Sequence, residues 1–171
     1  MQTLKTELIT MSGILRVAIV CGALAVGGCS GPGAPAKVDP SDPAITAIID
    51  SLLSVALDGA ARADADRALE VVADSGEVTL VVGNVMFTDL NKIRSGFRET
   101  YAGLERQNQT LLEKRIRVIS PDVAIASIIG EGTYTDKAGW TSEPVDIATT
   151  LVFVKENEGW RVRHAQQSIT R

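Results

Sequence analysis

From Leu111 onward the sequence reads as strands separated by turns, and this pattern limits the folds open to the chain. Turn residues such as those of Ser120-Pro121-Asp122 interrupt four apolar or alternating runs,. The expected strands cover residues 111–119, 123–129, 147–154 and 160–169. Consecutive strands joined by short turns pair antiparallel, so we predict an antiparallel sheet. Residues 123–129 are apolar on both faces, which favours a central strand.

The preceding segment has mainly helical signals. Asp42 can cap a helix that starts at Pro43 and carries apolar residues at helical spacing as far as Ala56,. A short helix is expected from Asp64, followed by two short strands on either side of the Gly83-Asn84 turn,. A third helix, capped by Thr88 or Asp89, carries an apolar stripe of Leu90, Ile93, Phe97, Tyr101 and Leu104. This order predicts an α+β domain with its helices gathered on one face of the sheet.

Both cysteines, Cys21 and Cys29, precede this domain, so neither a disulfide nor a cysteine-based metal site can form inside it,. Residues 17–28 form an apolar run after Arg16 that is too short to span a bilayer, which is typical of a signal sequence,. Met11 is an alternative start that would give this signal a simpler basic N-terminus.

The sequence Val26-Gly27-Gly28-Cys29 resembles the lipobox of bacterial lipoproteins, in which the cysteine is lipidated and becomes the first mature residue. The resemblance implies a signal peptide over 1–28, a flexible Gly- and Pro-rich tether over 29–42 and a domain over 43–171. It also implies export to the cell envelope and attachment to a membrane by lipid at Cys29. An ordinary secretory signal and an uncleaved anchor remain the alternatives.

Composition excludes several classes of function. The formal net charge is −4, so no basic surface is expected for nucleic acid or anionic membranes,. His164 is the only histidine and carboxylates do not cluster, so no metal is expected,. The Gly-rich tether is not followed by a strand-to-helix phosphate loop, and no cofactor is predicted.

The order of elements and the C-terminal sequence resemble the SnoaL-like branch of the nuclear transport factor 2 family. The residues that carry the resemblance include Asp64-Ala65-Asp66, residues 93–97 and a C-terminal series of Thr150, Lys155, Gly159, Trp160, Val162, His164 and Ser168. The resemblance implies a cone-shaped curved antiparallel sheet packed on three N-terminal helices, with a pocket at the open end. Relatives include isomerases, dehydratases and cyclases as well as proteins that catalyse no reaction, so the fold leaves function open.

The last hairpin decides which residues face that pocket. With Gly159 in a three-residue loop, Glu156 pairs with Trp160, and Thr150 shares the pocket face with His164. A two-residue loop shifts the register by one. We prefer the first register, which adds Gln166 and Ser168 to the pocket and brings Tyr101 within reach from the third helix. The opposite face then carries a series of apolar residues that predicts a covered patch: Ile147, Leu151, Phe153 and Ile169,. Because relatives often dimerise through this surface, the resemblance implies a homodimer.

Two functional hypotheses follow. In the first, the domain is a non-catalytic module for assembly or for binding a small apolar ligand, with a candidate ligand set of Tyr101, Thr150, His164, Gln166 and Ser168. In the second, it is an isomerase, dehydratase or cyclase in which His164 and Tyr101 act as acid and base. His164 is alternatively a hydrogen-bonded structural residue. Many relatives carry a histidine at the position of Gln166, whose amide cannot exchange protons, and no carboxylate pair is recognisable, so we favour the first hypothesis.

Overall fold

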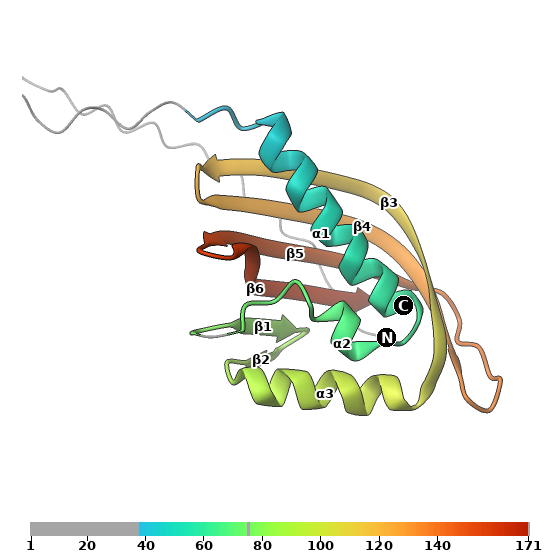
Figure 1. Cartoon of the computed structure of the whole chain (residues 1–171). Helices are drawn as coiled ribbons and strands as arrows, with labels where there is room; N and C mark the ends of the chain where they lie inside the picture. The colour runs from blue at the N-terminus through green and yellow to red at the C-terminus, as the bar shows by residue number, and fades with distance from the viewer. Residues whose placement is uncertain (1–37, 75, 171) are drawn as a thin grey trace, which may run out of the picture. The chain divides into compact units, whose positions relative to one another are not determined.

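The computed structural model describes residues 38–74 and 76–170. The expected signal peptide, Cys29 and the tether as far as residue 37 lie outside the described residues. Figure 1 labels the helices and strands in chain order. Their bounds are α1 Pro43–Ala61, α2 Ala65–Ala68, β1 Thr79–Val82, β2 Val85–Phe87, α3 Leu90–Ala102, β3 Leu104–Ser120, β4 Val123–Asp136, β5 Val145–Glu156 and β6 Gly159–Thr170.

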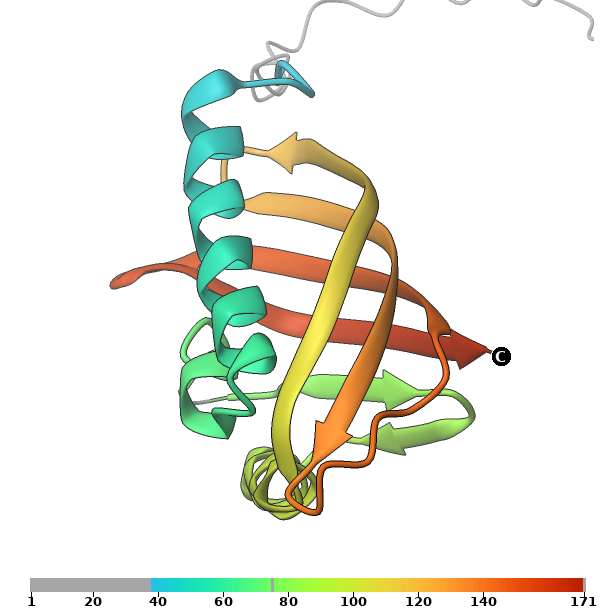
Figure 2. The ribbon, with the colours of Figure 1, turned by 90° about the vertical axis from the view of Figure 1, so that its right-hand side faces the viewer.

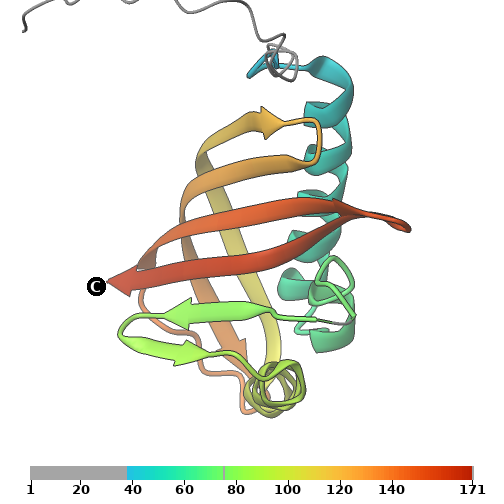
Figure 3. The same cartoon turned by 90° about the vertical axis from the view of Figure 1, so that its left-hand side faces the viewer.

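The strands form one sheet in the order β2-β1-β6-β5-β4-β3. The four long strands β3 to β6 pair antiparallel, as predicted from their short turns. β1 instead runs parallel to β6, from Thr79 beside His164 to Val82 beside Gln167, so the sheet is mixed rather than wholly antiparallel. β1 enters from α2 rather than through a hairpin with β6, and therefore no tight turn forces an antiparallel pairing. The predicted α+β fold is confirmed (Figures 1 and 3).

Helix α1 begins as the sequence predicts and lies across the concave face of the sheet (Figure 1). The Asp42 carboxylate accepts hydrogen bonds from the backbone N–H groups of Ala44 and Ile45 at 2.9 and 3.1 Å,. By length and composition alone this 19-residue helix, with a mean hydropathy of 1.6, could cross a membrane. Its residues Ile49 and Leu53 are buried against the sheet, while most of the helix is partly or fully exposed.

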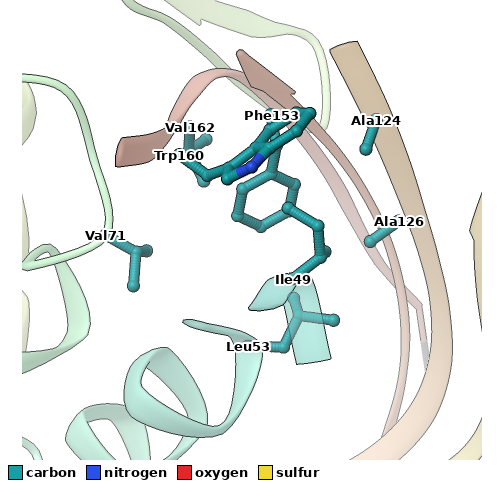
Figure 4. Close-up of a cluster of buried hydrophobic side chains, with 8 residues drawn as sticks. All are labelled: Ile49, Leu53, Val71, Ala124, Ala126, Phe153, Trp160 and Val162. Atoms are coloured by element: carbon teal, nitrogen blue, oxygen red, sulfur yellow. The ribbon is translucent and has the colours of Figure 1, made fainter. Parts of the chain in front are cut away.

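The main core lies between α1 and the strand ends nearest the β3–β4 and β5–β6 turns. Ile49 and Leu53 of α1 meet Phe153 of β5, which has no exposed surface (Figure 4). The fully buried Ala124 and Ala126 of β4 have small side chains, which leaves room for the helix to approach the sheet closely,. The remaining buried members are Val71, Trp160 and Val162.

The sheet is strongly curved along β3 and β4, which bend toward α3 in Figure 2. A register shift between Leu111 and Glu113 interrupts the β3–β4 ladder, and such bulges bend a strand,. Two glycines of β4 lie opposite the bend. A Cβ atom on Gly130 would stand 2.7 Å from the Thr110 carbonyl oxygen, and one on Gly132 would stand 2.9 Å from that of Asn108. Only glycine therefore permits this close approach of the two backbones.

The boundary between α3 and β3 differs from the prediction. Asp89 caps α3 by accepting from the backbone N–H groups of Asn91 and Lys92 at 2.9 and 3.3 Å. The helix ends at Ala102, with Gly103 at its C-cap, so Leu104 belongs to β3 and not to the helical stripe. The strand expected from Leu111 therefore starts seven residues earlier. The intervening residues are mostly polar and have no apolar alternation, which is why the sequence pattern missed them.

The preferred register of the last hairpin is wrong at the turn. Glu156 pairs with Gly159, not with Trp160, and Phe153 pairs with Val162. The ladder then shifts by one residue at Arg163, and beyond this point Val152 pairs with His164 and Thr150 with Gln166, as the sequence analysis expected. The extra residue thus lies four positions beyond Gly159, inside the strand,.

The shift reverses the assignment of faces. Phe153 is in the core beside α1, and Leu151 packs against the same cluster. Because neighbouring residues of a strand point to opposite faces, Val152 and its partner His164 lie on the convex face, away from α1,. Phe153 was expected on an outer, dimer-forming face, and that prediction is wrong.

Candidate functional site

The concave face of the sheet is hollowed at the end that α1 does not cover. A cavity of about 350 Å³ lies there, at the start of β3 and β5 and the end of β4 and β6. Its apolar wall consists of Val145, Ile147 and Ile169, and Ile169 is 51% exposed, so the cavity opens to solvent. Its other lining residues are Gln107, Gln109, Gly132, Thr133 and Tyr134. An apolar wall with a few convergent polar groups is typical of a small-molecule site.

The polar side of the cavity is built around Gln107. This residue pairs with Tyr134 across β3 and β4, so both project from the concave face at the same level. The amide nitrogen of Gln107 is buried and has no hydrogen-bond partner among the described residues. A buried donor without an acceptor costs roughly 1–3 kcal/mol, so this atom favours any ligand that brings an acceptor.

Tyr101 of α3 stands behind Gln107. Burial raises the pKa of the Tyr101 phenol, and the nearby amide of Gln107 opposes the rise, although the two groups form no hydrogen bond of normal geometry,. The phenol therefore stays protonated near neutral pH. A phenol can donate or accept, and an amide can do both, so the pair can rearrange when a ligand engages Gln107. Phe97 packs on the Tyr101 ring, with ring centroids 5.6 Å apart.

The sequence model of the family described as the SnoaL-like domain matches residues 49–171, which include all of this site. The chain belongs to the SnoaL-like family. The resemblance inferred from the C-terminal motifs is thereby confirmed. No curated protein matches the chain.

Solved structures share the fold of this SnoaL-like chain at low sequence identity. A nuclear transport factor 2-like protein from Salmonella enterica has a TM-score of 0.66 at 17% identity, over 75% of this chain and 92% of that one. A ketosteroid isomerase-like protein from Erwinia carotovora has a TM-score of 0.59 at 20% identity, over 72% and 94%. The association domain of the calmodulin-dependent kinase CaMKII from C. elegans has a TM-score of 0.59 at 17% identity, over 75% and 98%.

The five candidate ligand residues predicted from the sequence lie in two different places in the SnoaL-like domain. Tyr101 lies beside the cavity, through its contact with Gln107. The other four are together on the convex face, away from the cavity, at adjacent positions of β5 and β6: Thr150, His164, Gln166 and Ser168,. His164 lies between Val152 of β5 and Thr79 of β1.

The residues that line the cavity were missed for identifiable reasons. Ile147 and Ile169 were assigned to the outer face by the hairpin register, whereas they project from the concave face, as Phe153 does. Gln107 and Gln109 lie in the segment not recognised as strand. Their spacing of two was the available signal, since it places both side chains on one face of a strand.

Two acidic residues at α2 of the SnoaL-like domain, outside the cavity lining, serve structural roles. Asp64 caps α2 by accepting from the backbone N–H of Arg67 at 3.0 Å, as predicted. Asp66 forms an ion pair with Arg98 of α3 at 2.6 Å. Across 38–74 and 76–170, the histidine and acidic side chains form no group of three that could hold a metal ion.

Proposed function

We propose that this SnoaL-like protein binds a small, mostly apolar molecule in the cavity at the open end of its sheet. The observation that carries the proposal is the combination of an apolar wall, Val145, Ile147 and Ile169, with the unpartnered amide nitrogen of Gln107. The wall favours apolar surface of the ligand, and the amide favours an acceptor such as a carbonyl or carboxylate oxygen. The ligand therefore carries both.

Binding without catalysis fits the residues around the cavity better than a reaction does. The described lining residues include neither a carboxylate nor a histidine, and His164 is on the convex face. General acid–base catalysis needs a group that exchanges protons near the working pH. The raised pKa of Tyr101 makes its phenol a hydrogen-bond donor rather than a base.

An enzyme of the isomerase, dehydratase or cyclase type is the second candidate. The likeness in fold to the ketosteroid isomerase-like protein supports it. In that case the protonated phenol of Tyr101 and the amide of Gln107 polarise a substrate carbonyl as hydrogen-bond donors. Turnover of a carbonyl substrate that is lost in Tyr101→Phe, with folding unchanged, would distinguish this function from simple binding.

The setting of the protein is also part of the proposal. Lipid on Cys29, next to Val26-Gly27-Gly28, attaches the chain to a membrane of the cell envelope,. Two copies associate through the convex face, where aliphatic side chains such as Ile125, Val152 and Val154 lie among polar ones. The similarity in fold to a domain named for association supports this arrangement.

Two matched substitutions test the cavity with 2-naphthoate, a flat apolar carboxylate, as the probe. Ile147→Glu places a charge on the cavity wall, whereas Ile129→Glu makes the same change on the convex face of β4. The full-length chain and its variants are compared by calorimetric titration in one detergent buffer, so that micelle partition is a common background. We expect Ile147→Glu to weaken binding at least roughly tenfold. Ile129→Glu should leave the affinity within about twofold of the wild type.

Equal effects of the two substitutions, or no measurable binding by the wild type, would contradict the proposal. Melting temperatures of both variants provide the folding control. Ile129 is 45% exposed, so its replacement is expected to be tolerated.

A further inference from the structure

Trp140 is unusual among the aromatic residues of the chain because its indole is 56% exposed. The other tryptophan, Trp160, is buried in the core. Trp140 lies in the turn that connects β4 and β5, and its ring meets that of Tyr134 edge to face, with centroids 5.7 Å apart. Tyr134 lines the cavity and Trp140 does not, so the exposed indole lies just outside the cavity, against one of its lining residues.

The turn holds Trp140 in place through both its backbone groups. The Asp136 carboxylate accepts hydrogen bonds from the backbone N–H groups of Ala138 and Trp140, both at 2.9 Å. The Trp140 carbonyl accepts from the N–H of Asp136, also at 2.9 Å. The backbone of Trp140 therefore loses little conformational freedom when a ligand packs against the indole.

The residues that follow fix the side on which the indole lies. Thr141 and Thr135 form an isolated antiparallel bridge, and their hydroxyl groups are 3.1 Å apart. Ser142 exchanges hydrogen bonds with the backbone of Tyr134, through its N–H at 3.0 Å and its hydroxyl at 3.2 Å. Alternation along both strands then places Trp140 and Tyr134 on one side and the two threonines on the other.

The spacing between the aromatic pair and Gln107 sets the size of what could touch both. Gln107 and Tyr134 are cross-strand partners, whose Cβ atoms are typically about 5 Å apart,. The ring of Trp140 lies beyond that of Tyr134, with 5.7 Å between the ring centroids. A ligand that touches both Gln107 and Trp140 must therefore extend past the Tyr134 ring, as a fused bicyclic group with one attached acceptor can.

We propose that Trp140 is a ligand-contacting residue that selects for a flat, unsaturated group. The flat group lies against the indole at the opening, while its acceptor reaches the amide nitrogen of Gln107. Offset or edge-to-face contact between π systems adds to the attraction from apolar burial, and a saturated ring of the same size lacks this term. This inference rests on the proposed binding function of the cavity.

The test compares 2-naphthoate with decahydro-2-naphthoate, which has the same skeleton and carboxylate but no π system. Trp140→Leu keeps an apolar side chain without a ring, and Trp140→Tyr keeps a ring. We expect Trp140→Leu to weaken binding of 2-naphthoate by roughly three- to tenfold and that of the saturated analogue by less than about twofold. Trp140→Tyr should retain 2-naphthoate affinity within about threefold. Titrations use the full-length chain in the same detergent buffer as before.

Other outcomes would overturn the inference in distinguishable ways. Equal losses for the two probes, or no loss for either, would show that Trp140 does not select flat groups, while a binding defect in Ile147→Glu would still support the cavity. Naphthoate binding that is insensitive to both Trp140→Leu and Ile147→Glu would remove the cavity and this inference together. A change in molecular mass on light scattering for Trp140→Leu would assign the indole to a contact between copies instead.

Discussion

The buried amide nitrogen of Gln107 has no hydrogen-bond partner within the described part of the chain. We therefore predict that removing it makes the ligand-free protein more stable. Replacing Gln107 by leucine and Tyr101 by phenylalanine removes the unpartnered amide and the phenol beside it, and fills their space with apolar groups of similar shape. We expect this double variant to unfold at a higher temperature than the wild type in the absence of ligand. We also expect it to bind 2-naphthoate less tightly.

The magnitude follows from two terms. Removing a buried donor that lacks an acceptor recovers roughly 1–3 kcal/mol, and replacing its polar neighbour by an apolar group of the same shape leaves no new polar group unsatisfied. The net gain in the free energy of unfolding is therefore about 1–3 kcal/mol, which raises the melting temperature by roughly 3–12 °C in a domain of this size. Loss of a hydrogen bond to a carboxylate acceptor should weaken probe binding by at least about tenfold.

Scanning calorimetry of the ligand-free protein measures the first effect, and calorimetric titration measures the second. Gln107→Leu alone is the control, because it leaves the half-buried Tyr101 phenol beside an apolar group and should gain less stability than the double variant. A double variant that melts below the wild type would refute the reasoning, since the amide would then contribute to stability. Unchanged naphthoate affinity would show that Gln107 does not contact the ligand.

Four further predictions concern the anchor, the assembly and the two faces of the sheet. Cys29→Ser should move the protein from the membrane fraction to the soluble or unprocessed fraction, and an intact mass that shows an unmodified cysteine in the wild type would exclude lipidation. Val152→Glu, on the convex face, should halve the mass measured by light scattering while the protein stays folded; a dimer that persists would place the interface elsewhere. His164→Ala should leave naphthoate binding within about twofold of the wild type, because His164 faces away from the cavity, and a larger loss would reassign the site,. Phe153→Ala should cost about 3–5 kcal/mol in urea unfolding, since Phe153 is fully buried, whereas a cost below about 1 kcal/mol would support the outward position first expected from the sequence,.

The sequence predicted the elements well where local chemistry decides them. Asp42 and Pro43 start α1, and Asp89 starts α3, because an N-cap depends on side-chain and backbone atoms only a few residues apart,. The four long strands were evident because short turns separate apolar runs. The family could be inferred from the C-terminal strands for the same reason.

The candidate site was harder to predict because it depends on a single shift in register. The extra residue at Arg163 lies within a continuous strand, and no Gly or Pro marks it. Its position decides whether Phe153 or Val152 faces the helices, since one residue exchanges the faces of a strand. The contribution of Gln107 could not be foreseen either, because it depends on how β3 bends across β4 at Gly130 and Gly132.

The entry of the chain into the domain has a mechanical consequence. The carbonyl of Pro40 accepts a hydrogen bond from the N–H of Val118 at 3.0 Å, which attaches the start of the domain to the last residues of β3. The cavity residues Gln107 and Gln109 lie near the other end of that strand, roughly 30 Å away along its length,. If the chain is held at Cys29, any pull along the tether acts on the end of the domain that contains Val118 and the start of α1. The opening lies toward the other end of the strand, away from this point of attachment.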